Sequence, residues 1–225
     1  MSWTKNTNLI TKQETMASKD LFQAVCDEIG EYYEKKGFKY SRTRPKIVYK
    51  DKVLKVEICF WSSRYNTSGK SVTLEILPNF YSLEVIKKGL TKSASKIAKG
   101  FILGHTDLLI TKSENPNNKI IKKQIFGDIH EKDVEGKLEP TISHHHICDI
   151  YGINEEKFNK IIGFIDEKII PWIDKIQTAD GIIDFIENRP KRVYSNLLGE
   201  GVNSDFVPYC NLRFPELNIE KRLKE

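Results

Sequence analysis

The sequence predicts an α+β protein in which a mostly antiparallel sheet is covered by helices on one face. Apolar residues recur with helical spacing near the N-terminus and again in the C-terminal third. Between these regions apolar and polar residues alternate, which is the period of a strand with one buried face. The links between the alternating segments are short, so consecutive strands are expected to pair as an antiparallel meander.

The first helix is expected to begin at Ser18 and to end at Gly37. Serine is a common helix cap, and glycine often ends helices because it adopts the left-handed conformation without strain. Between them one apolar stripe is formed by Leu21, Phe22, Val25, Cys26, Ile29, Tyr32 and Tyr33. Charged residues fill the opposite side, which is typical of an amphipathic helix.

Several strands are expected after Gly37, because the period there changes to two. The first four lie in FKYSRTRP (38–45), KIVYKD (46–51), KVLKVEICFWSSR (52–64) and KSVTLEILPNFYS (70–82). A second helix is expected over 82–99, followed by strands in GFILGHTDLLITK (100–112) and KIIKKQIFGDIH (119–130). A charged loop over 131–140 then leads to a strand in TISHHHICDIYG (141–152).

The C-terminal third returns to helical spacing. An apolar stripe from Phe158 to Ile173 predicts a helix that begins near Asn154 and that Pro171 bends or restarts. Thr178 is expected to cap a shorter helix. We therefore expect a flexible lead-in over 1–16, a single α+β domain over 17–190 and an irregular extension over 191–225. The extension is expected to end in either a final helical turn or a frayed tail over NIEKRLKE (218–225).

The composition is that of an ordinary globular protein. With 225 residues, of which 39% are hydrophobic, the chain can bury a core. No apolar run reaches the roughly 18 to 20 residues of a membrane span, and the N-terminus lacks the apolar stretch of a secretory signal. The four cysteines form no CxxC pair, which favours reduced, buried thiols. We expect a cytoplasmic protein with no membrane partner.

The charge is unevenly distributed along the chain. Residues 1–112 contain 20 lysine and arginine residues against 11 acidic ones, whereas 113–225 contain 16 against 20. A basic first half favours an anionic partner, although the two halves can also attract each other. Proteins that follow a phosphate backbone usually carry a denser basic stripe, so nucleic acid is less favoured as a partner than protein.

Three consecutive histidines raise the question of a metal site. Strand alternation places Ile142, His144, His146, Cys148 and Ile150 on one face. Two imidazoles and a thiolate suit zinc, and His105 or His130 could complete the ligand set. The two isoleucines that bracket the face are equally typical of a strand that faces the core. The core interpretation is favoured, so no cofactor is expected, with zinc at His144, His146 and Cys148 as the alternative.

A basic and aromatic group is the favoured contact surface. Alternation from Phe38 places Tyr40, Arg42 and Arg44 on one side of the first strand, and Trp61 and Arg64 follow in a nearby strand. Guanidinium groups beside aromatic rings can bind carboxylate or phosphate groups. The alternative is that these arginines only cover exposed rings.

No catalytic residues are expected. The phosphate-binding motif GxxxxGK[ST], the nucleophile motif GxSxG and the zinc motif HExxH are all absent from the sequence. Asp51 and Glu57 imitate part of a nuclease core but lack the lysine that this core requires.

Part of the chain resembles a known group of proteins. The features are a first helix followed by GFKYSRTRP (37–45), a strand EICFWSSRYN (57–66), VTLEILPNFYS (72–82) before a helix, and a late helical pair EKIIPWIDKIQTADGIIDFIE (167–187). Over residues 18–188 the chain resembles a bacterial family of domains of unknown function. The resemblance implies a cytosolic bacterial or phage-related protein, in a group sometimes linked to toxin immunity or phage defence.

The sequence therefore supports one leading function and two alternatives. The leading hypothesis is a non-catalytic module that binds a protein partner in bacterial immunity or defence. The alternatives are a metal-dependent enzyme that uses His144, His146 and Cys148, and a nucleic-acid-binding protein that uses the basic first half. The sequence leaves the oligomeric state open.

Overall fold

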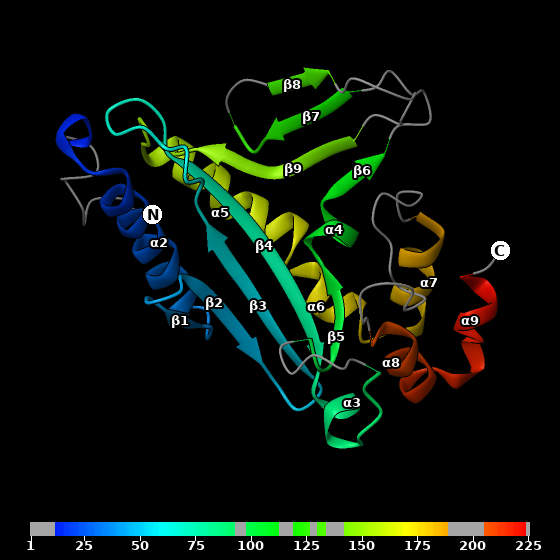
Figure 1. The fold of residues 1–225 in the computed structure, drawn as a ribbon. Coiled ribbons are helices and arrows are strands. Elements are labelled where there is room, and N and C mark those ends of the chain that lie inside the picture. Colours follow the sequence, from blue (N-terminus) through cyan, green and yellow to red (C-terminus); the bar gives the residue numbers. More distant parts are fainter. Residues whose placement is uncertain are drawn as a thin grey trace.

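The fold was determined as a computed structural model, which describes residues 12–92, 98–112, 119–126, 130–133, 142–188 and 205–223. The helices are η1 (Gln13–Thr15), α2 (Ser18–Glu34), α3 (Leu83–Lys87), α4 (His105–Leu108), α5 (Glu155–Lys168), α6 (Pro171–Lys175), α7 (Ala179–Asn188), α8 (Phe206–Arg213), η2 (Pro215–Leu217) and α9 (Ile219–Arg222). The strands are β1 (Lys39–Ser41), β2 (Lys46–Lys50), β3 (Leu54–Trp61), β4 (Thr73–Ser82), β5 (Phe101–Gly104), β6 (Ile110–Lys112), β7 (Lys119–Gln124), β8 (His130–Asp133) and β9 (Ile142–Asp149). Figure 1 shows their arrangement.

The described strands form one sheet in the order β1-β2-β3-β4-β9-β7-β8, with β5 also paired to β4 and β6 to β9. Every pair is antiparallel except β7 with β9. The long strand β4 pairs with β9 through residues 73–75 and with β5 through residues 79–81. The expected class, an α+β fold with a mostly antiparallel sheet, is confirmed.

One face of the sheet packs against the helices. Along β3 the core residues Leu54, Val56, Ile58 and Phe60 are at most 5% exposed, and the even-numbered residues of β4 follow the same pattern. Helices α2 and α5 both cover this face (Figure 1). The two helices also contact each other, since the buried Tyr33 hydroxyl on α2 donates to Asp166 Oδ1 on α5 at 2.8 Å. The odd-numbered residues of β3 and β4 form the opposite face, here called the open face, and keep part of their surface exposed.

The helices expected at both ends of the domain are present. Ser18 is the first residue of α2 and not its cap, and Gly37 ends that region with φ of 89°. Asn154 caps α5, since its Oδ1 accepts a hydrogen bond from Lys157 N at 2.9 Å. Pro171 begins a new helix, because it is the first residue of α6, a position where the missing N–H costs nothing. Thr178 Oγ1 accepts from Gly181 N at 3.1 Å at the start of α7.

Three middle elements differ from expectation. The helix expected over 82–99 comprises only α3, because Gly89 at φ 66° closes it; residues 93–97 lie outside the described residues. The strand expected over 100–112 is divided by α4, where Asp107 Oδ2 accepts a hydrogen bond from Gly104 N at 2.8 Å. Strand β8 occupies the start of the expected loop over 131–140.

Both terminal segments are more ordered than expected where the structure describes them. Gln13 lies in the expected lead-in but is buried, with its side chain bonded to Ile153 O and Gly152 N at 3.0 and 2.6 Å. Within the extension that was expected to be irregular, residues 206–217 form α8 and η2. Helix α9 corresponds to the final helical turn that was one of the two alternatives for residues 218–225. Phe206, Tyr209 and Ile219 are 0% exposed, so this segment belongs to the core. Residues 1–11 and 189–204 lie outside the described part of the chain.

Candidate functional site

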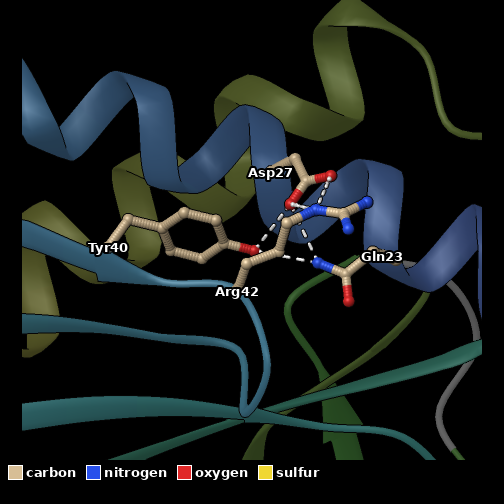
Figure 2. A network of polar contacts seen from close by, with 4 residues as sticks. All are labelled: Gln23, Asp27, Tyr40 and Arg42. Carbon is tan, nitrogen blue, oxygen red and sulfur yellow. Dashed lines mark hydrogen bonds and ion pairs between the residues drawn. The ribbon is translucent and has the colours of Figure 1, made fainter.

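Two of the predicted contact residues belong to a polar network around Asp27 on α2 (Figure 2). Asp27 Oδ1 accepts hydrogen bonds from the Tyr40 hydroxyl at 2.9 Å and from Gln23 Nε2 at 2.8 Å. The Nε of Arg42 lies 3.1 Å from both carboxylate oxygens. Burial and the Asp27 carboxylate together raise the pKa of Tyr40. The network therefore fastens the end of β1 to α2.

The predicted contact residues do not form one surface. Arg42 and Arg44 were expected on a strand, but β1 ends at Ser41 and residues 42–45 form the turn to β2. Tyr40 pairs with the buried Ile47, which places it on the helix-covered face. Trp61 instead lies on the open face of β3. The expected single strand fails because Pro45 has no N–H to donate to a strand ladder.

Trp61 and Tyr65 are prominent on the surface at the end of β3. Their exposed fractions are 50% and 77%, and they are two of the four large hydrophobic residues exposed in the described part of the chain. The guanidinium carbon of Arg64 lies 4.9 Å from the centre of the Tyr65 ring, and its Nη2 donates to the Tyr65 hydroxyl at 2.7 Å. We call residues Trp61, Arg64 and Tyr65 the Trp61–Tyr65 corner. Tyr65 was missed by the sequence analysis, although the adjacent turn-forming residues 66–69 indicated a surface position.

The loop that carries this corner is held by side-chain hydrogen bonds. Ser62 Oγ donates to Thr73 O at 2.8 Å and accepts from Asn66 Nδ2 at 2.6 Å. Asn66 Oδ1 in turn accepts from Thr73 N at 2.9 Å, so the segment 62–66 is bound to β4 at both of its ends. Ser63 Oγ accepts from Tyr65 N at 3.1 Å. The exposed aromatic residues are thus presented on an organised loop.

Arg44 lies at the same end of the sheet as the Trp61–Tyr65 corner. Phe60 N donates to Pro45 O at 2.8 Å, which brings the turn 42–45 beside the end of β3. Arg44 is exposed and makes no ion pair with another described residue. The corner therefore has a free cation beside it, whereas Arg42 is paired with Asp27.

The open face next to the corner carries an ion-paired group of two lysines and one glutamate. Glu57 Oε1 lies 2.8 Å from the Nζ atoms of both Lys46 and Lys55. Burial would raise the pKa of Glu57, but the hydrogen bonds from the two lysines outweigh it and lower that pKa. Cys59 is half-buried on the same face, and burial raises the pKa of its thiol. This part of the face offers neither an unpaired charge nor a thiolate.

The histidine segment forms strand β9, and three imidazoles meet there. The rings of His144 and His146 lie 5.8 Å apart, and the ring of His105 on α4 lies 5.3 Å from that of His146. Cys148 is fully buried opposite Leu74, and burial raises the pKa of its thiol. Within the described residues no group of three or more histidine, cysteine, aspartate or glutamate side chains is arranged to hold a metal ion. Because Cys148 is 0% exposed, the face of β9 that carries it is part of the core at this residue.

The pKa of His105 predicts a loss of stability in acid. Burial lowers this pKa from its usual value of 6.5, and His144 lowers it further. The unfolded state then binds more protons than the folded state, so the free energy of unfolding falls as the pH drops through about 6.5 toward the lowered folded value. His105→Asn is expected to weaken this dependence, measured as the change in Tm between roughly pH 7.5 and pH 5.5.

His145→Gln is the matched control for this measurement. His145 is on the same strand, but its Nε2 lies 2.9 Å from Thr111 Oγ1 and its ring is not part of the cluster. An unchanged acid dependence in His105→Asn would contradict the prediction.

A cleft of about 660 Å³ separates the outer side of α5 from β9. Its lining is formed by Ile125, His145, Glu156, Asn159, Lys160, Gly163, Phe164, Glu167 and Lys168. Lys160 is already paired with Glu156 at 2.6 Å, and the remaining charges are of both signs. This cleft therefore favours no particular ligand charge.

The chain matches no protein-family model, no curated protein and no solved structure. No helix among the described residues is long and apolar enough to cross a membrane. The fold class is α+β, and the Trp61–Tyr65 corner is the candidate contact surface because its aromatic side chains are exposed.

Proposed function

We propose that this protein is a non-catalytic binding module that contacts a protein partner through the Trp61–Tyr65 corner. The observation that carries the proposal is the exposure of Trp61 and Tyr65, at 50% and 77%, on a loop fixed by hydrogen bonds to β4. Tryptophan, tyrosine and arginine are the residue types that contribute most to protein interfaces. All three types are adjacent here.

The organised loop reduces the cost of binding. Ordering a mobile loop or a long side chain consumes part of the free energy of association. At this corner the backbone is already bonded through Ser62 and Asn66, and the Arg64 guanidinium already rests on the Tyr65 ring. Less of the free energy of association is therefore spent on ordering this loop.

The alternatives have weaker support. A zinc enzyme would use His144, His146 and Cys148 as ligands, but Cys148 is 0% exposed opposite Leu74, and no group of three or more possible ligands among the described residues is arranged to hold a metal ion. A nucleic-acid surface around the corner would require a dense group of unpaired cations. Arg44 makes no ion pair with another described residue, but Arg42 is paired with Asp27, and Lys46 and Lys55 are paired with Glu57. The cytoplasmic location and the setting in bacterial immunity or defence stay predictions from the sequence.

The test is a cross-linked capture from the native host with the Trp61→Ala, Tyr65→Ala double variant. We expect the partner chain that the wild type captures to be lost, with an affinity lower by roughly 30-fold or more once the partner is purified. The reason is that the two substitutions remove the exposed aromatic area without touching the core. Far-UV circular dichroism and Tm should match the wild type.

The control is the Ile86→Ala, Leu90→Ala double variant. It removes the other two large exposed hydrophobic side chains, which are 40% and 45% exposed and lie on and just after α3. This variant should capture the same partner as the wild type. Equal capture by the Trp61→Ala, Tyr65→Ala variant would overturn the proposal.

A further inference from the structure

The end of the sheet opposite the Trp61–Tyr65 corner carries a group of exposed lysines. They lie on the β2–β3 turn and around α3, which are held together by the hydrogen bond from Leu83 N to Val53 O at 2.8 Å (Figure 1). Ser82 N also donates to Gly100 O at 2.7 Å, which brings the chain before β5 to the same place. The members are Lys50, Lys52, Lys87, Lys88, Lys92 and Lys99, all exposed. We call this surface the lysine end.

The charge of the lysine end is not neutralised by the described acids nearby. None of its six lysines forms an ion pair with another residue in the part of the chain that the structure describes. Glu84 is paired with Arg213 at 3.4 Å. Asp51 accepts from the Tyr49 hydroxyl and from the backbone of the β2–β3 turn, and Asp205 is fully buried. The surface therefore carries a net positive charge.

Two aliphatic side chains project from the same surface. Ile86 and Leu90 are 40% and 45% exposed. Their position is fixed by the turn that ends α3, in which Leu90 N donates to Val85 O at 3.0 Å and Gly89 N donates to Ile86 O at 3.1 Å. In this helix-ending motif the residue after the glycine usually packs back on the helix. Here Leu90 is instead 45% exposed.

We propose that the lysine end docks on a membrane surface that contains anionic lipid. Lysines attract the negative headgroups, and exposed aliphatic side chains enter the boundary between headgroups and acyl chains. Surfaces that bind single-stranded nucleic acid combine basic residues with aromatic rings on which bases stack, whereas the exposed apolar residues here are aliphatic. A duplex would be bound through the lysines alone and would leave Ile86 and Leu90 without a role, so it is an outcome of the test. The lack of a spanning run led us to expect no membrane partner, but attachment at a membrane surface needs no spanning run.

The test is co-sedimentation of the full chain with vesicles. We expect binding to phosphatidylcholine vesicles that contain about 30% phosphatidylserine, and little binding to phosphatidylcholine alone. The Lys87→Glu, Lys88→Glu variant and the Ile86→Ser, Leu90→Ser variant should each bind at least roughly tenfold more weakly. Added salt should weaken wild-type binding, because the lysines act through charge.

The Lys19→Glu, Lys70→Glu variant is the matched control. Both lysines are exposed at the other end of the sheet, where Ser18 N donates to Ser68 Oγ, and the change in net charge is the same. This variant and Trp61→Ala should bind vesicles like the wild type. Absence of binding to the anionic vesicles would overturn the proposal. So would equal loss in the control, or a duplex DNA bound more tightly than the vesicles and unaffected by Ile86→Ser, Leu90→Ser.

Discussion

Replacement of Asp205 by alanine is expected to lower the free energy of unfolding by about 4 kcal/mol. Asp205 is 0% exposed, and its carboxylate accepts hydrogen bonds from Lys92 N and Gly100 N, both at 2.7 Å, and from the Thr91 hydroxyl. Alanine removes this shared acceptor, and the donor at Gly100 is itself buried. The unmet desolvation of several donors exceeds the cost of a single lost hydrogen bond.

Urea denaturation followed by tryptophan fluorescence measures this effect. Asp205→Asn should fall between the wild type and Asp205→Ala, because the amide keeps one acceptor oxygen but turns an N–H₂ group toward donors. Glu216→Ala is a control in the same C-terminal segment; Glu216 is exposed, so its removal should change stability by less than about 0.5 kcal/mol. A loss below about 1 kcal/mol in Asp205→Ala would show that the donors find other acceptors.

Asp205 also connects the C-terminal helices to the lysine end. It is the residue directly before α8, and Asp205 N donates to Phe101 O on β5 at 2.6 Å. Through Lys92 and Gly100 its carboxylate positions the backbone around two of the six lysines. Vesicle binding must therefore be tested with surface substitutions, since Asp205→Ala would disturb the lysine end through the fold.

The two surfaces lie at opposite ends of β3. This strand runs from Leu54, beside the β2–β3 turn, to Trp61, and its eight residues span about 23 Å at the usual rise per residue. Substitutions at this separation act independently. A variant that changes both surfaces should lose both activities by the amounts of the single-surface variants, which separates the two proposals.

Most of the sheet and the long helices could be predicted from the sequence, because burial on one side imposes a regular period. The even-numbered residues of β3 and β4 are apolar for that reason, with the exception of Ser82 at the end of β4. The predicted stripe of α2 is buried at Leu21, Val25, Cys26, Ile29 and Tyr33 and partly buried at Phe22 and Tyr32. Gly37, Asn154 and Thr178 end or begin helices through local geometry that single residues encode.

The candidate site could be predicted only in part, because it depends on how strands are placed relative to helices. Trp61 and Arg64 were identified and lie at an exposed corner, but Tyr40 faces α2, where it meets Asp27. Nothing local to residues 38–45 indicates that Arg42 turns back to a carboxylate on the preceding helix. Helix α8 was missed for a related reason: all of residues 205–210 are buried, so no amphipathic period marks them.

Gly181→Ala is expected to destabilise the protein by roughly 3 kcal/mol, although alanine is the better helix former. Gly181 lies in the first turn of α7, and a Cβ there would collide with the carbonyl group of Lys175 on α6. The obstacle is backbone, and that carbonyl is already held by Thr178, whose Oγ1 donates to it at 3.0 Å. The clash can therefore be relieved only if α6 and α7 move apart.

Gly163→Ala makes the same chemical change on α5 with the opposite expected sign. No atom lies within 4 Å of a Cβ at Gly163, so alanine should stabilise the protein by about 0.5–1 kcal/mol through helix propensity alone. Urea denaturation of both variants, with unchanged m-values, measures the difference directly. If both substitutions were stabilising, the close approach of α6 to α7 would be wrong. If both were destabilising, the open space beside Gly163 would be contradicted.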